Sequence, residues 1–273
     1  MSNKKWAGER LETFVYNEST IEHLHRYAIA MDLVKDKVVL DIACGEGYGS
    51  NLLANVARSV TGVEKDAATV KEAKRKYTKP NLQFVEGLAE KIPAADQSFD
   101  AVISFETLEH ITGHDQMFRE IKRVLKPGGL LIISTPDKKF YSDLPGYKNP
   151  FHEKELYEKE FREIISRYFR HSRLIYQRLM LSSLAWLPGE SELKQYKGNY
   201  EKIISQEGID PVYLLAIASD TEIAGPSSSI FAGEAILQTA LEQKEKELKK
   251  TASYRVGHFL LFPFKLIRDT FKK

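Results

Sequence analysis

Two groups of residues in this sequence have the types and spacing that chemistry requires. The first is a glycine-rich turn, Asp41-Ile42-Ala43-Cys44-Gly45-Glu46-Gly47, followed by the acidic Glu64. Glycines let a backbone approach a ligand without Cβ clashes and offer amide groups at the start of a helix. A carboxylate about 20 residues after such a turn can accept hydrogen bonds from both hydroxyls of a ribose. The spacing indicates a nucleotide-like cofactor, although a single turn of this kind can also be purely structural.

The second group combines carboxylates and imidazoles. It consists of Glu106-Thr107-Leu108-Glu109-His110 and of His152 in a later loop. Offsets of three and four residues place Glu106, Glu109 and His110 on one face of a helical turn. Three alternatives are open: a divalent-metal site of Glu106, Glu109, His110 and His152, a metal-free general base at His110 or His152 with Glu106 in the catalytic set, or a structural role.

The elements that position both groups follow from the hydrophobic pattern. From about Lys37 onward, short apolar runs alternate with amphipathic helical stretches, which is typical of a parallel sheet covered by helices. We expect strands at 38–42, 59–64, 81–85, 99–105 and 130–134, and helices at 50–56, 67–77 and 116–125. Lys126-Pro127-Gly128-Gly129 is expected to separate the last helix from the fifth strand.

Past Thr135 the pattern changes. A loop rich in Pro, Gly and Tyr leads to a helix at 154–166, and strands at 173–179 and 212–219 form an edge hairpin with an insertion of loop and helix at about 182–210. The predicted fold is therefore α/β: a Rossmann-like, doubly wound, seven-stranded sheet with an edge hairpin and a C-terminal helical tail. The expected divisions are an N-terminal helical cap at 1–36, with helix over 6–33, the α/β domain at 37–222, and a charged helix with a basic amphipathic tail at 230–273.

Composition limits the classes of function. Lys and Arg total 40 against 38 for Asp and Glu in 273 residues, so no overall basic footprint for nucleic acid exists, and no nucleic-acid partner is expected. The single cysteine, Cys44, cannot form an intramolecular disulfide, and the first five residues lack the apolar stretch of a secretory signal. No window is apolar enough for a membrane-spanning helix. A cytoplasmic location is expected, with peripheral contact at the inner membrane face left open.

Several motifs resemble those of class I S-adenosylmethionine-dependent methyltransferases. Val38–Gly47 resembles the first motif of that family, and Gly87–Pro93 resembles its adenine-contacting loop, with Leu88 where a carboxylate is common. Ser98–Val102 and Glu120–Gly129 resemble the motifs of its fourth and fifth strands. The resemblance covers about residues 37–135 and implies S-adenosylmethionine as the cofactor.

The resemblance also implies which residues bind that cofactor. Asp41, Gly45 and Gly47 would surround the methionine part, Glu64 would hold the ribose, and Leu88 and Ala89 would border the adenine. Ala43, Lys65 and Ser104 complete the expected set. A nicotinamide dinucleotide is disfavoured because its G-x-G-x-x-G fingerprint would need a glycine where Ser50 stands. Cys44 is expected to be a small buried residue and not a nucleophile.

The acceptor is less determined. The Glu-x-x-Glu-His pattern with a later histidine resembles methyltransferases of ubiquinone biosynthesis and of plant small-RNA ends, in which it binds Mg²⁺. The strings Gly8-Glu9-Arg10, Glu22–Tyr27 and Asn149–Glu155 and the basic tail resemble methyltransferases found beside glycosyltransferases of bacterial surface-glycan synthesis. This second resemblance implies O-methylation of a sugar hydroxyl on a glycan or a glycan precursor. The alternatives are a quinone-type or other small-molecule phenol and a non-catalytic scaffold that keeps the fold. An RNA 2′-hydroxyl is disfavoured because no basic stripe with interleaved aromatic residues appears outside the tail.

The C-terminal tail gathers apolar residues among cations. Residues 254–273 contain four phenylalanines together with Arg255, Lys265, Arg268, Lys272 and Lys273. Such a segment can pack back on the domain, form a homodimer contact, or lie at an anionic membrane surface. The sequence leaves these three alternatives open.

Overall fold

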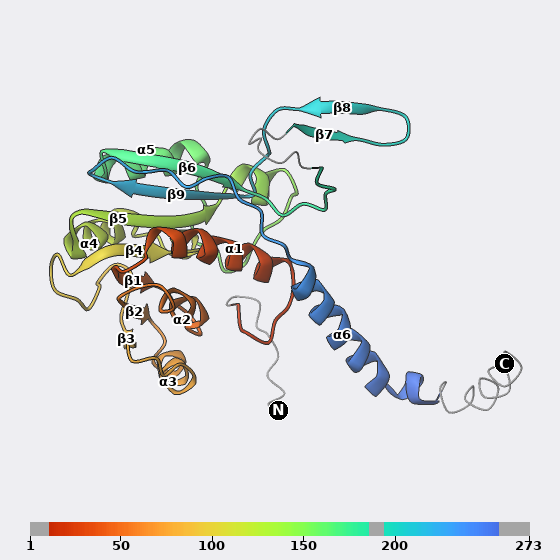
Figure 1. The fold of residues 1–273 in the computed structure, drawn as a ribbon, viewed down its shortest axis with the longest axis horizontal. Helices are drawn as coiled ribbons and strands as arrows, with labels where there is room; N and C mark the ends of the chain where they lie inside the picture. Colours follow the sequence, from red (N-terminus) through yellow and green to blue (C-terminus); the bar gives the residue numbers. More distant parts are fainter. Residues whose placement is uncertain (1–10, 186–193, 257–273) are drawn as a thin grey trace, which may run out of the picture.

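The computed structural model describes residues 11–185 and 194–256 and shows a seven-stranded mixed sheet (Figure 1). The strand order is β3-β2-β1-β4-β5-β9-β6. The first five strands are parallel, and β9 is antiparallel to both β5 and β6. The predicted α/β sheet with an edge hairpin is confirmed. The strands of this sheet are β1 (Val38–Ile42), β2 (Ser59–Glu64), β3 (Leu82–Glu86), β4 (Phe99–Ser104), β5 (Leu125–Pro136), β6 (His171–Gln177) and β9 (Tyr213–Ser219).

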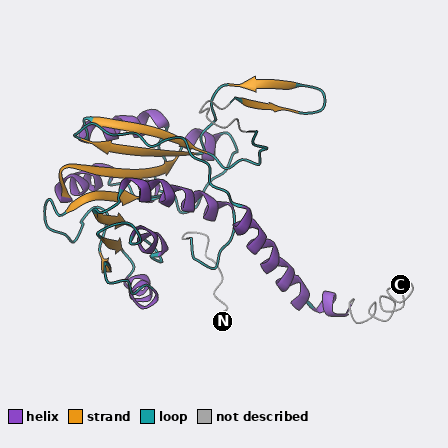
Figure 2. Cartoon of the chain, viewed as in Figure 1, coloured by secondary structure: helices purple, strands orange, loops and turns teal. Residues whose placement is uncertain are grey.

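Helices cover both faces of the sheet (Figure 2). Successive residues of a strand point to opposite faces, so Val39 and Leu40 of β1 belong to different hydrophobic clusters. One cluster contains residues of the first two helices, and the other contains residues of the fourth and fifth. The helices are α1 (Glu18–Leu33), α2 (Tyr48–Leu53), α3 (Ala67–Lys76), α4 (His114–Val124), α5 (Glu158–Tyr168) and α6 (Glu234–Lys250).

Helix α1 begins later than the sequence pattern predicted. Asn17 caps its first turn by accepting a hydrogen bond from the amide of Thr20, and the Thr20 hydroxyl lies 3.3 Å from the amide of Asn17. This capping box fixes the start at Glu18. Residues 11–17 are not helical, and the remainder of the expected helix, residues 6–10, lies outside the described residues.

Three further expectations need correction. Lys126–Gly129 does not separate helix from strand, because α4 ends at Val124 and β5 begins at Leu125; a register shift opposite Phe99 and Ala101 absorbs the glycines as a bulge. The fifth helix begins at Glu158 and not at 154. The described part of the insertion contains a hairpin of β7 (Gln195–Gly198) and β8 (Ile203–Gln206) and no helix, while 186–193 lies outside the described residues.

The C-terminal helix α6 extends away from the sheet (Figure 1) and has no buried residue. The segment before it contacts α1, since the His25 ring lies 2.8 Å from the Ser229 hydroxyl and 6.0 Å from the Phe231 ring. The tail beyond Val256 lies outside the described residues. The division into cap, domain and tail therefore stays a prediction. Within 11–185 and 194–256, no helix is both long and apolar enough to cross a membrane.

We predict that Gly49→Ala destabilises the protein. A Cβ at Gly49 in α2 would fall inside the ring of Tyr27, which packs edge-on against Tyr48 and Phe105. Overpacking of this kind costs roughly 1–3 kcal/mol. Thermal unfolding should show a lower midpoint than in the wild type, whereas Asn51→Ala in the same helix should not; equal midpoints for the two variants would contradict the packing described.

Candidate active site

The carboxyl ends of the parallel strands form one edge of the sheet, and the strand order reverses beside β1. In sheets of this type, ligands bind in the crevice at that point. The glycine-rich turn follows β1 here. Gly45 and Gly47 have φ angles of +54° and +88°, which other residues rarely adopt. A Cβ at Gly47 would also lie 2.6 Å from the Phe84 ring, so close packing against β3 requires glycine.

Glu64 ends β2 beside this turn. Its carboxylate accepts a hydrogen bond of 3.1 Å from the amide of Gly45 and another of 3.1 Å from the amide of Asp66. The side chain is buried. The residue expected to bind a ribose therefore also fixes the glycine turn relative to β2.

Asp41 lies in β1 just before the turn and is buried. Its Oδ2 atom accepts a hydrogen bond of 2.6 Å from Ser50 and a long one of 3.5 Å from Tyr27. Burial raises the pKa of Asp41 to about 7, and the hydrogen bonds from Ser50 and Tyr27 oppose that rise. The protonation of this carboxyl therefore changes near neutral pH.

Two buried polar atoms at this edge lack hydrogen-bond partners within the described part of the chain. They are Oδ1 of Asp41 and Oγ of Ser104, which stand in the neighbouring strands β1 and β4. Buried polar groups are normally satisfied, so such atoms indicate a ligand or water. Together with the glycine turn and Glu64, they fit a polar cofactor of the S-adenosylmethionine type.

The remaining expected cofactor residues line the same edge. Ala43 has a φ of +54° and is exposed, Lys65 is exposed, and Leu88 is half exposed while Ala89 is buried. Cys44 is buried, and burial raises the pKa of its thiol, which makes it a poor nucleophile. The structure places these residues near the turn or at neighbouring strand ends; their contacts with a cofactor stay predictions.

Glu106 does not share a helical face with Glu109 and His110, and that expectation was wrong. Glu106 has a φ of +51°, and the short 3₁₀ helix η1 (Leu108–His110) begins two residues later. Its carboxylate instead accepts a hydrogen bond of 2.6 Å from Ser134 and lies 3.5 Å from the guanidinium of Arg26. Of the four metal ligands that the sequence indicated, Glu106 is therefore not part of the group that converges.

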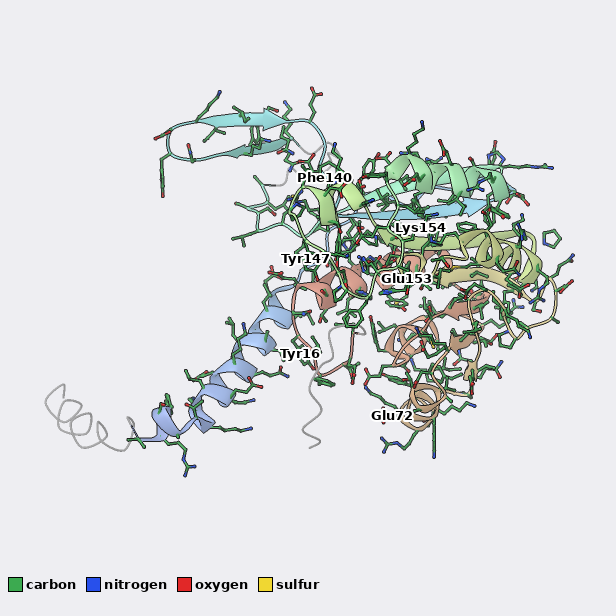
Figure 3. All side chains as sticks on the ribbon, turned by 180° about the vertical axis from the view of Figure 1, so that it is seen from behind. Tyr16, Glu72, Phe140, Tyr147, Glu153 and Lys154 are labelled. Atoms are coloured by element: carbon green, nitrogen blue, oxygen red, sulfur yellow. The ribbon has the colours of Figure 1, made fainter. Side chains whose placement is uncertain are left out.

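Glu109, His110 and His152 do converge. One ligand atom from each lies within 4.8 Å of the others, and the two imidazole rings meet edge to face at 5.1 Å. The loop that carries His152 is held to η1 because the amides of Glu153 and Lys154 donate to the carbonyl of Glu109. Figure 3 labels Glu153 and Lys154 in this loop, together with Tyr147 and Phe140.

Hydrogen bonds distinguish the two histidines. Nδ1 of His110 lies 2.9 Å from the carbonyl oxygen of Phe151, which can only accept, so Nδ1 carries the proton and Nε2 the lone pair of the neutral ring. His152 Nδ1 lies 2.6 Å from Glu155, and its Nε2 lies 3.0 Å from the amide nitrogen of Asn149. The Asn149 oxygen accepts from the amide of Phe151, which fixes its NH₂ group toward His152. Both ring nitrogens of His152 are therefore engaged.

The charge of Glu106 acts on two buried carboxyl groups, Glu109 beside the histidines and Glu22 in α1. Burial and the nearby charge of Glu106 raise the pKa of Glu109 well above its ordinary value, while a hydrogen bond of 3.1 Å from Thr135 favours the anion. Burial also raises the pKa of Glu22 in α1 to about 7, against the opposing charge of Arg26. Both carboxyl groups are therefore protonated more readily than an exposed glutamate.

Several site residues carried no assigned role in the sequence analysis. Arg26 and Tyr27 of α1 reach Glu106 and Asp41, and Glu155 and Asn149 hold His152. The strings Glu22–Tyr27 and Asn149–Glu155 contained them, but spacing along the chain gives no sign of contacts between α1 and the ends of β1 and β4. Tyr141 and Tyr213, whose rings lie 5.9 Å apart, complete this side of the edge.

Comparison with known proteins finds similar methyltransferases. Residues 40–133 match a family described as a methyltransferase domain. A probable S-adenosylmethionine-dependent methyltransferase of Mycolicibacterium smegmatis is 40% identical over 130 residues, which cover 46% of this chain and 49% of that protein. A phthiotriol/phenolphthiotriol dimycocerosates methyltransferase of Mycobacterium ulcerans is 35% identical over 120 residues, covering 43% and 44% of the two chains.

The solved structure of the YcgJ protein from Bacillus subtilis has a similar fold, with a TM-score of 0.53 and 19% identity over 73% of this chain and 100% of that one. The chain spans about half the length of the curated relatives that it matches. The family match and these relatives together support an enzyme with a class I S-adenosylmethionine-dependent methyltransferase domain. The predicted cofactor class is thereby supported.

We predict that Glu64→Ala weakens binding of S-adenosylhomocysteine at least tenfold. The change removes a carboxylate that can hydrogen-bond both ribose hydroxyls, and hydrogen bonds to charged groups contribute about 1.5–3 kcal/mol each. Isothermal titration calorimetry measures the effect, with Lys65→Ala as the neighbouring exposed control. Unchanged affinity in Glu64→Ala would remove Glu64 from the cofactor site.

We also predict that Asp41 makes stability depend on pH. Its pKa is about 7 in the folded protein against a reference value of 3.8, so the folded state holds the proton more tightly. This contribution to stability is fully present below pH ~4 and is lost as the pH rises through about 7, at up to about 1.4 kcal/mol per unit. Between pH 5 and 8, the free energy of unfolding in urea should fall less with rising pH in Asp41→Asn than in the wild type. Identical declines would contradict this account.

Proposed function

We propose that this protein is an S-adenosylmethionine-dependent methyltransferase that methylates a sugar hydroxyl on a glycan or a glycan precursor. The observation that carries the proposal is the fixed tautomer of His110. Its protonated Nδ1 faces the carbonyl of Phe151, and its Nε2, the ring nitrogen that can accept the proton of a hydroxyl, lies 4.0 Å from Oε1 of Glu109. Hydroxyl acceptors need such a base because an alcohol is a weak nucleophile while it keeps its proton.

The surroundings of His110 suit a carbohydrate better than a flat phenol. The carboxylate of Glu106 can accept hydrogen bonds from hydroxyls, and the ring of Tyr141 stacks beside His152. The Mycobacterium ulcerans relative is named for a triol, which also favours a hydroxyl acceptor. A quinone-type phenol remains the second candidate.

The chain contributes positioning and proton transfer. Asp41, Glu64 and the glycine turn would hold the cofactor, and S-adenosylmethionine, when bound, supplies an electrophilic methyl group. His110 Nε2 would take the proton that the acceptor hydroxyl loses when it receives the methyl group. The carbonyl of Phe151 stabilises the charged imidazole through its hydrogen bond with Nδ1.

A divalent ion such as Mg²⁺ is the alternative use of the same residues. The convergence of Glu109, His110 and His152 favours it, because carboxylate and imidazole are suitable ligands. However, His152 uses both ring nitrogens in hydrogen bonds to Glu155 and Asn149, so an ion would have to displace one of them. We therefore prefer the metal-free base.

Two other expectations stay proposals. Peripheral contact with a membrane depends on the tail at 254–273, of which residues 257–273 lie outside the described part of the chain. A homodimer could use α6, whose Leu237, Leu241 and Leu248 are exposed.

The acceptor class can be tested with labelled S-adenosylmethionine and a panel of nucleotide sugars, lipid-linked glycans and catechol-type phenols. Mass spectrometry of the products should show one added methyl group on a sugar. Methylation of the phenols alone would replace the sugar by the second candidate, and no methylated product from any member of the panel would overturn the proposal.

We predict that His110→Ala lowers kcat by roughly 10²–10⁴-fold, the usual contribution of a general base, while S-adenosylhomocysteine binding is retained. His152→Ala should cost less, because that ring positions the loop and its Nε2 is already engaged. The exposed His171 provides a control, His171→Ala, with wild-type activity.

The same activity assay distinguishes a metal-free general base from a metal site. Full activity of the wild type in excess EDTA is expected for a metal-free base. Loss of activity in EDTA and its recovery with Mg²⁺ would instead assign Glu109, His110 and His152 as ligands.

A further inference from the structure

Arg26 of helix α1 is fully buried but incompletely bonded. Its Nε atom donates a hydrogen bond of 2.7 Å to Gln177 in β6. Its Nη1 and Nη2 atoms have no hydrogen-bond partner in the part of the chain that the structure describes. A buried donor left unsatisfied is costly, and the cost is greater for a charged group. An arginine in this condition indicates a missing partner.

The groups around this guanidinium are acceptors and an aromatic ring. Oε1 of Glu106 lies 3.5 Å from Nη1, and the guanidinium carbon lies 4.3 Å from the centre of the Tyr213 ring. Glu22 stands one helical turn before Arg26, and its carbonyl accepts a hydrogen bond of 2.9 Å from Gln177. The N–H groups of Arg26 can only donate hydrogen bonds, and the carboxylate of Glu106 beside them can only accept.

Arg26 and the groups around it lie on the side of the edge where the methyl acceptor is expected to bind. The contacts of Arg26 come from the end of β4 and from the hairpin β6–β9, whereas Asp41 and Glu64 stand at the ends of β1 and β2. A chain of ring contacts leads from Tyr213 to Tyr141 at 5.9 Å, then to His152 at 5.3 Å and to His110 at 5.1 Å. The unsatisfied guanidinium, which lies over the Tyr213 ring, and the proposed base are thus linked by one series of side-chain contacts.

The chemistry of these groups selects a ligand. A hydroxyl both donates and accepts hydrogen bonds, so it can accept one from an N–H of Arg26 while it donates one to Glu106. An anionic ligand would match Arg26 but would be repelled by Glu106. A phenol with one hydroxyl would leave one of the two Nη atoms unsatisfied.

We propose that Arg26 and Glu106, backed by the ring of Tyr213, form a subsite that binds two adjacent hydroxyls of the acceptor. This inference rests on the proposed sugar acceptor and deepens it by naming a vicinal diol as the feature recognised. The subsite lies beside the base and not on it, so Arg26 determines specificity while His110 acts on the hydroxyl that is methylated.

Saturation-transfer NMR with simple probes tests the subsite. The probes are cis-cyclohexane-1,2-diol and methyl α-D-mannopyranoside, with cyclohexanol as the control, all added to the protein saturated with S-adenosylhomocysteine. The wild type should bind the two diols about tenfold more tightly than cyclohexanol, since a second hydroxyl bonded to a charged group is worth about one power of ten.

The variants Arg26→Lys and Glu106→Gln should lose this preference. Lysine keeps the charge beside Glu106 but lacks the planar pair of donors. Asp32→Asn, an exposed change in the same helix, should keep the preference. S-adenosylhomocysteine affinity, measured by calorimetry, should stay within about threefold of wild type in every variant, because only a change of several-fold would indicate a lost hydrogen bond.

Three results would overturn the inference: equal binding of the diols and cyclohexanol by the wild type, an unchanged preference in both variants, or a tenfold loss of S-adenosylhomocysteine affinity in Arg26→Lys. The last would assign Arg26 to the carboxylate of the cofactor instead. Methylation of a sugar in the product assay together with any of these results would leave the proposed function standing, so the two failures can be told apart.

Discussion

The parallel pairing of β1 with β2 and β4 is the constraint on which this site depends. It brings the carboxyl ends of three strands, and with them Asp41, Glu64 and Ser104, to one edge of the sheet. None of these residues is near another along the chain. The helices pack on the two faces and leave that edge for the glycine turn, the 3₁₀ helix η1 and helix α1.

The edge gathers more buried carboxyl groups than a stable core would tolerate without compensation. Burial of an ionised carboxylate is costly unless it is paired, hydrogen-bonded or protonated, and this structure uses all three. Glu64 is bound by backbone amides, Glu106 lies beside Arg26, and Glu22 and Asp41 have pKa values raised to about 7. Such arrangements are typical of functional sites, where ligand binding supplies the missing partners.

The placement of the glycine turn beside Glu64 could be predicted from the sequence because its determinants are local. A glycine turn between a strand and a helix, and a carboxylate at the end of the next strand, are separated by short and regular distances along the chain. The part of the site proposed for the acceptor could not be predicted in this way. The positive φ of Glu106 removes it from the helical face that its spacing indicated, and the partner of its carboxylate, Arg26, is far away in the sequence. The tautomers of His110 and His152 depend on a carbonyl and an amide supplied by a folded loop.

Calorimetric titration of the unmodified protein with S-adenosylhomocysteine tests the central claim most directly, since every role assigned to the edge presupposes the cofactor. The account predicts saturable binding of one equivalent, and much weaker binding of NAD under the same conditions. The absence of S-adenosylhomocysteine binding, or tighter binding of NAD, would contradict it.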